Sequence, residues 1–79
     1  MIKTIFRPSY QGLIEELIAA RKNSGITQQD LAEKLGRPLN YPSKIEHVDR
    51  RLDVMEFIEY AEAVNLDPIA LLKKIISHR

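Results

Sequence analysis

Three helix-start signals constrain this chain more than any other feature of its sequence. Each consists of a polar residue that can cap a helix, followed by a stretch with apolar residues at helical spacing; the three cap residues are Thr27, Asp53 and Asp67. Three residues after the first two come Asp30 and Glu56, placed to complete a capping box. The third is followed by a proline, which suits the first helical position. The chain is therefore predicted to fold as several short helices.

The apolar residues around these starts support the same prediction. Each start is bracketed by two apolar residues that can pack across it as a hydrophobic staple: Ile26 with Leu31, Leu52 with Phe57, and Leu66 with Leu71. Upstream, Tyr10–Asn23 carries apolar residues on one helical face and ends before Gly25, which suits a left-handed cap. The predicted helices are Tyr10–Asn23, 28–35, roughly 39–47, Val54–Val64 and a last one after Asp67. In the fourth, the inner face is predicted to hold Val54, Phe57, Ile58, Ala61 and Val64, with Glu56, Glu59 and Glu62 facing solvent.

Size and composition set limits on function. A chain of 79 residues, 44% of them hydrophobic, allows one small domain with a modest core. Cysteine is absent, and His47 and His78 lie far apart without ligand spacing, so we expect neither a disulfide nor a metal site or other cofactor. No apolar run approaches the roughly 18 residues that a membrane span requires, and no secretory signal precedes the domain, so a cytoplasmic location is expected.

The charges are distributed unevenly, although their sum is only +1. Between Gly36 and Arg51 four basic residues outnumber two acidic ones. The following stretch to Pro68 holds five acidic residues and no basic one. A basic middle beside an acidic flank is typical of a protein that approaches a polyanion from one side.

Residues 1–6, MIKTIF, break the helical pattern. Alternation at these positions predicts a short strand or an arm, with pairing to a second subunit as the favoured interpretation. The domain organisation expected from the sequence is an N-terminal arm over residues 1–9 and a helical domain over residues 10–79.

The helices at 28–35 and 39–47, joined by a tight turn at Gly36, match a helix-turn-helix, whose second helix enters the major groove of DNA. The surrounding motifs ARKNSGITQQDLAEKLGRP, SKIE and RRLDVMEFIEYAEAVNLDP resemble the lambda-repressor and Cro-like helix-turn-helix family, often called Xre-like, over about residues 10–76. The resemblance implies an all-α, compact five-helix domain. It also implies a sequence-specific DNA-binding protein that acts as a dimer on a pseudo-palindromic operator.

The resemblance assigns roles to individual residues. Gln28, at the start of the second helix, matches a position beside the phosphate backbone, where a helix N-terminus attracts anions. Four residues match positions that face base edges: Leu39, Asn40, Ser43 and Lys44. Asparagine can bond adenine, lysine can reach guanine acceptors, and leucine can contact a thymine methyl group. For Lys44, a phosphate contact is the alternative.

Other polar residues are expected to support this interface. Arg21 and Glu46 resemble an internal ion pair of the family, which ties the first helix to the recognition helix. Arg37, Arg50 and Arg51 flank that helix and suit phosphate contacts, which position a protein on DNA without reading its sequence. Tyr41 is expected either to contact a phosphate or to pack against the turn.

Two residues depart from the family pattern. Pro42 stands where an aliphatic residue is usual, and Val48 stands where glycine is common. If the recognition helix began at Leu39, Pro42 would remove its first hydrogen bond. In the favoured alternative Asn40 is the cap, and Pro42 lies in the first turn, where a backbone N–H has no partner within the helix. The side chain of Asn40 would then bond to its own backbone and be less able to read a base. Because Val48 is β-branched, it is poorly suited to a left-handed cap, so we expect the helix to continue past His47 or to exit by another turn.

The function expected from these residues is that of a transcriptional regulator that occupies a promoter as a homodimer on double-stranded DNA. Repression is the favoured mode of action, and activation is the alternative. The alternative to a regulator is a protein-interaction module on the same fold, such as an antitoxin bound to its toxin. An enzyme is not expected, because no nucleophile with a matching base and no glycine-rich phosphate loop is recognisable.

Overall fold

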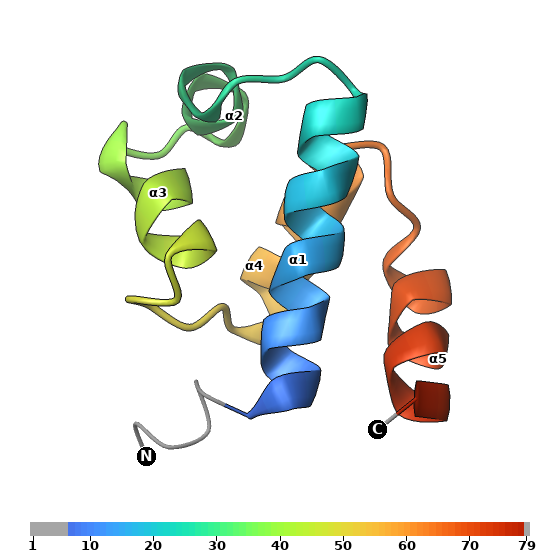
Figure 1. The fold of residues 1–79 in the computed structure, drawn as a ribbon. Helices are drawn as coiled ribbons and strands as arrows, with labels where there is room; N and C mark the ends of the chain where they lie inside the picture. The colour runs from blue at the N-terminus through green and yellow to red at the C-terminus, as the bar shows by residue number, and fades with distance from the viewer. Residues whose placement is uncertain (1–6, 79) are drawn as a thin grey trace.

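A computed structural model describes residues 7–78 (Figure 1). Five helices make up the described fold: α1 (Pro8–Asn23), α2 (Gln28–Leu35), α3 (Asn40–Glu46), α4 (Val54–Ala63) and α5 (Pro68–His78). No strand occurs between residues 7 and 78, so the predicted all-α, five-helix fold is confirmed. The strand or arm predicted for residues 1–6 lies outside the described residues.

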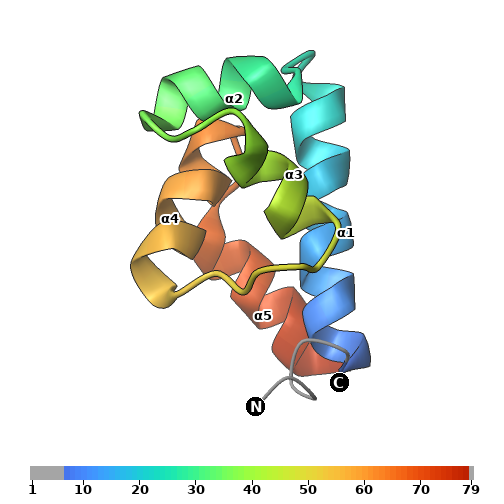
Figure 2. The ribbon, with the colours of Figure 1, turned by 90° about the vertical axis from the view of Figure 1, so that its left-hand side faces the viewer.

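The first helix lies between the third and the fifth. In Figure 1, α1 separates α3 from α5, and it contacts both of them. The second helix contacts α3 and α4, and Figure 2 shows α2 running across the end of the molecule above α3. The core that these helices enclose includes Leu17 of α1, Leu31 of α2, Ile45 of α3 and Tyr60 of α4, all fully buried. Helix α3 is thus packed against both α1 and α2.

All three predicted helix starts form. Thr27 accepts a hydrogen bond from the Asp30 backbone N–H at 3.0 Å, and the Asp30 carboxylate accepts one in return, which completes the capping box. The corresponding box at Asp53 is also complete. At the last start, Asp67 accepts a hydrogen bond from the Ile69 N–H at 2.9 Å. The first helix begins at Pro8, two residues before its predicted start, because a proline fits the first turn of a helix.

Helices α1 to α4 all end in the same way. After each, one residue has a positive φ: Gly25, Gly36, Val48 and Asn65. The backbone N–H of that residue and the next one return to carbonyls of the last turn, as Val48 to Ile45 at 3.1 Å and Asp49 to Lys44 at 2.9 Å illustrate. The expectation for Val48 was therefore wrong, since it adopts φ 61° despite its branched side chain. The two backbone hydrogen bonds formed at this corner outweigh the steric cost of a left-handed conformation at a β-branched residue.

Two predictions about α4 need correction. Val54, predicted to face inward, is 74% exposed, because at the first residue of the helix it lies beyond the core cluster. Glu56, predicted to face solvent, is only 7% exposed. Its carboxylate turns back to accept the Asp53 N–H and is covered by two arginine side chains.

Among the described residues, none of the helices has the length and apolarity that crossing a membrane would require. Within residues 7–78 the acidic and histidine side chains form no group suited to hold a metal ion.

We predict that Val48→Gly stabilises the protein by about 0.5–1 kcal/mol. Relief of a left-handed conformation is worth roughly 1–2 kcal/mol. Glycine also makes the unfolded chain more flexible, which lowers the free energy of unfolding by about 0.4–1 kcal/mol. Urea denaturation would measure the difference. Val48→Ala is the control, because it removes the same packing but keeps a Cβ; equal stability of the two variants would contradict the strain at Val48.

Candidate nucleic-acid interface

The recognition helix begins one residue earlier than the favoured prediction. Leu39 precedes the helix as its cap residue with φ −55° and ψ −34°, and Asn40 is the first helical residue. Asn40 as a side-chain cap was therefore wrong. Pro42 becomes the third helical residue, a position whose N–H has no partner within a helix, so its ring removes no helical hydrogen bond. The start is closed instead by the Tyr41 N–H, which donates to the Pro38 carbonyl at 2.9 Å.

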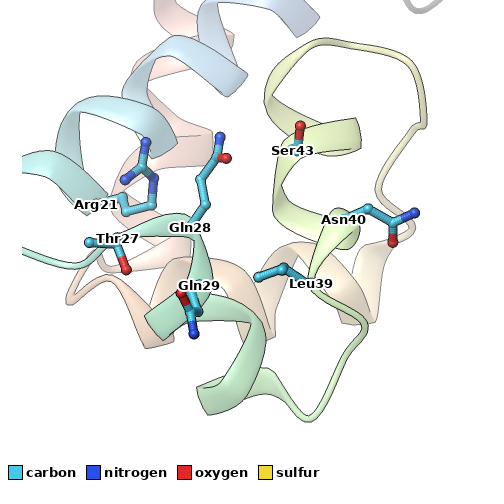
Figure 3. Close-up of a pocket in the computed structure, with 7 residues that line it drawn as sticks. All are labelled: Arg21, Thr27, Gln28, Gln29, Leu39, Asn40 and Ser43. Carbon is cyan, nitrogen blue, oxygen red and sulfur yellow. The ribbon is translucent and has the colours of Figure 1, made fainter.

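This geometry leaves the asparagine side chain outside the helix cap. Asn40 and Leu39 are both exposed at the tip of α3 (Figure 3). Their side chains leave the helix in opposite directions, the leucine toward α2 and the asparagine away from it. Lys44 is exposed one turn further on, and Ser43 is half-buried. The predicted base-facing residues thus come from one short helix and reach solvent to different extents.

An open hollow lies between the starts of α2 and α3 (Figure 3). Seven residues line it: Arg21, Thr27, Gln28, Gln29, Leu39, Asn40 and Ser43. Most of them carry hydrogen-bonding groups, while Leu39 adds one apolar surface. A hollow of this composition offers both donors and acceptors to a polar partner.

The carboxylate of Glu46 fixes the orientation of α3. Arg21 of α1 donates to both of its oxygens, at 2.6 and 3.0 Å. The Tyr60 hydroxyl of α4 donates to Oε2, and Gln28 Nε2 of α2 donates to Oε1 at 3.0 Å. Three helices therefore bind one side chain of the recognition helix. The structure brings Arg21 and Glu46 together as the family resemblance implies.

Burial and hydrogen bonding act on these groups in opposite directions. Burial disfavours the charge of Glu46, but hydrogen bonds from Arg21, Tyr60 and Gln28 outweigh it and lower the pKa of the carboxyl group. Burial, together with the bond to Glu46, raises the pKa of Tyr60, so this phenol stays a proton donor. The network is therefore charged and fully donated to at neutral pH.

A second cluster surrounds the ring of Tyr41, which is only 6% exposed. The guanidinium carbons of Arg37 and Arg50 lie 4.7 and 5.1 Å from the ring centroid. Both arginines also contact Glu56: Arg50 makes two hydrogen bonds, at 2.9 and 2.8 Å, and Arg37 makes an ion pair at 3.4 Å. The phosphate contacts expected of Arg37, Tyr41 and Arg50 stay predictions, as do those of Gln28 and Arg51.

Two residues central to these clusters were not recognised from the sequence. Tyr60 lies three residues after Phe57 and four before Val64, a spacing that indicates an inner-face position. Nothing in that spacing reveals that its hydroxyl meets Glu46. Glu56 was recognised only as a capping residue, although its carboxylate also holds two arginines.

Comparison with solved structures finds a close relative. The chain is similar to an XRE-family like protein from Pseudomonas syringae pv. tomato str. DC3000, with 47% sequence identity and a TM-score of 0.88. The match covers 95% of this chain and 92% of the other. No protein-family model matches the chain, and no curated protein sequence matches it significantly.

We predict that Glu46→Gln destabilises the protein by about 3 kcal/mol at pH 7, because it leaves the Arg21 charge buried without its partner. The folded carboxyl has a pKa below its ordinary value of 4.5, so its stabilisation is present above that pH and is lost as the pH falls below it. The stability difference from wild type should therefore narrow only below pH 4.5.

Chemical denaturation between pH 7 and pH 2 would measure this difference. Glu33→Gln is the matched control, because Glu33 is an exposed acid on α2. A difference between Glu46→Gln and wild type that stays constant with pH would contradict the ionised state of Glu46.

Proposed function

Because the chain belongs to the XRE-like helix-turn-helix family, we propose that it is a sequence-specific DNA-binding transcriptional regulator, with repression as its mode of action. The single observation that supports this most strongly is the state of α3. Its tip exposes Leu39 and Asn40, while its last residue, Glu46, is tied to three other helices. An exposed reading edge on a rigid support is what readout in the major groove requires.

The exposed side chains have the chemistry for reading bases. Asn40 can bond the N6 and N7 edge of adenine, Lys44 can donate to the acceptors of guanine, and Leu39 can contact the methyl group of thymine. Asn40 can do so because its amide is not used as a helix cap. Ser43 is a further candidate, and Gln28, Arg37, Arg50 and Arg51 are the candidates for contacts with the phosphate backbone. Tyr41 is buried against Arg37 and Arg50 and is therefore assigned to packing, the other alternative expected for it.

A homodimer is supported by the outer face of α5. Ile69, Leu72 and Ile76 lie three and four residues apart along it, and they are 61%, 41% and 60% exposed. Such a stripe favours association with another apolar surface. Since α5 lies on the far side of α1 from α3 (Figure 1), pairing through this stripe would leave both recognition helices accessible.

The proposed mechanism is occupancy of a promoter by a symmetric dimer, whose half-sites lie about 34 Å apart, one turn of DNA. The protein would act in the cytoplasm, associated with the nucleoid when bound to DNA. The proposal includes no enzymatic step and no cofactor.

Selection of bound duplexes from a random DNA library, in about 0.15 M salt, tests this proposal. An enriched, two-fold symmetric motif would support a dimeric regulator and identify the operator. Recovery of no enriched motif would count against it and favour the alternative of a protein-interaction module such as an antitoxin. For that alternative, the exposed Val54 and Met55 at the start of α4 are the relevant apolar surface.

We predict that Lys44→Ala relaxes base preference at one operator position by about 1–3 kcal/mol, because lysine bonds to a guanine edge would be lost. Binding assays on single-base variants of the operator would measure the change. Equal weakening on all sequences, with a salt slope reduced by about one unit, would instead place Lys44 on a phosphate.

We predict that Ile76→Asp weakens homodimerisation at least tenfold, because each subunit would place a charge in an apolar interface. Sedimentation equilibrium would measure the dissociation constant. Ser77→Asp adds the same charge to the neighbouring exposed residue of α5 and should have less effect. An unchanged dimer in the Ile76 variant would rule out the α5 stripe as the interface.

A further inference from the structure

Two arginines from opposite ends of the recognition helix meet on the same support. Arg37 precedes α3 and Arg50 follows it, yet both guanidinium groups contact the carboxylate of Glu56 and the ring of Tyr41. Arg50 forms two parallel hydrogen bonds to Glu56, at 2.9 and 2.8 Å, which fix the plane of its guanidinium group. Arg37 lies closer to the ring, at 4.7 Å from its centroid.

The cluster has more donors than its own carboxylate can use. A guanidinium group has five N–H donors, whereas Glu56 offers two oxygens and already accepts the Asp53 N–H. Arg50 uses one further donor on the Arg51 carbonyl, at 3.1 Å. The hydrogen bonds from Arg50, against a smaller effect of burial, lower the pKa of Glu56 to about 2, so the cluster carries two positive charges and one negative charge at neutral pH. It therefore retains both a net positive charge and unused donor capacity.

The two arginines, which carry the unused donors, lie on the solvent side of the cluster. The side chain of Glu56 is 8% exposed, whereas those of Arg37 and Arg50 are 35% and 40% exposed. Tyr41 is buried as well. An anion arriving from solvent would thus meet the two arginines first and would not need to displace the carboxylate beneath them.

We propose that Glu56 and Tyr41 are positioning residues that hold Arg37 and Arg50 together as one preformed receptor for a backbone phosphate of DNA. The inference rests on the proposed function and deepens it, because it assigns a binding role to an acidic residue. Ordering two long arginine side chains normally costs conformational entropy when a ligand binds. Here the protein has already ordered them, so the phosphate binds without that cost.

Glu56→Gln separates positioning from simple charge. If only the charge of Glu56 matters, removing this acid strengthens binding to DNA. If Glu56 positions the arginines, removing it weakens binding. Glutamine also completes a capping box, so the start of α4 is retained. Glu59→Gln is the matched control, because it makes the same change of charge at an exposed position one turn along the same helix.

The experiment measures the affinity of both variants for the selected operator duplex over a range of salt concentrations. We expect Glu56→Gln to bind about tenfold more weakly than wild type, with a salt slope reduced by about one unit, and Glu59→Gln to stay within about twofold. Glu56→Gln binding as tightly as Glu59→Gln, or weaker binding with an unchanged slope, would overturn the proposal.

A double-mutant cycle with Arg50→Ala tests whether Glu56 acts through the arginine. We expect Glu56→Gln to have little further effect on affinity once Arg50 is absent, whereas independent effects would add and overturn the proposal. Thermal unfolding of each variant confirms that it is folded at the assay temperature. A wild-type protein that binds no duplex would instead overturn the proposed function, and this receptor with it.

Discussion

The buried carboxylate of Glu46 is the interaction on which the rest of the site depends. It accepts hydrogen bonds from Arg21 of α1, Gln28 of α2 and Tyr60 of α4. The negative charge is tolerated at this buried position because both carboxylate oxygens accept hydrogen bonds. Removing one donor would leave the charge incompletely compensated. The orientation of a seven-residue helix, too short to be stable in isolation, is thereby fixed by its neighbours.

The second cluster complements the first. Glu46 holds the C-terminal end of α3 toward the core, whereas Glu56 forms ion pairs with the arginines that precede and follow the helix. One carboxylate serves orientation and the other serves a proposed contact with DNA. Under this proposal the acidic Glu56 is part of a surface for an anion, although a count of charges alone would suggest that it opposes one.

Local signals in the sequence were sufficient to predict the helices, because caps and staples act within a few residues. Thr27 with Asp30, and Asp53 with Glu56, form the predicted boxes. Interactions between residues distant in the sequence were harder to predict. The ion pair of Arg21 with Glu46 was predicted only through a family resemblance, and the Tyr60 hydroxyl bond was missed because spacing indicates burial but not a hydrogen-bond partner.

The same limit explains the errors at either end of α3. A good intrinsic cap such as Asn40 was preferred over Leu39, and Val48 was judged unsuited to a positive φ. Both judgements were based on single-residue preferences, which packing of Pro42 and Tyr41 and the closure of backbone hydrogen bonds override. The individual contacts with bases and phosphates depend on a partner and are not determined by this chain alone.

The shared geometry of the four helix ends has a consequence for how such a domain can diversify. At each end, the residue after the left-handed position donates its backbone N–H to a carbonyl of the last turn. Those residues are Ile26, Arg37, Asp49 and Leu66, which span apolar, basic and acidic chemistry. The backbone hydrogen bond of each corner thus does not depend on the side chain at these sites, although Ile26 and Leu66 also pack against the core. Mutation can alter the chemistry presented beside the recognition helix, at Arg37 and Asp49, without altering the architecture that presents it.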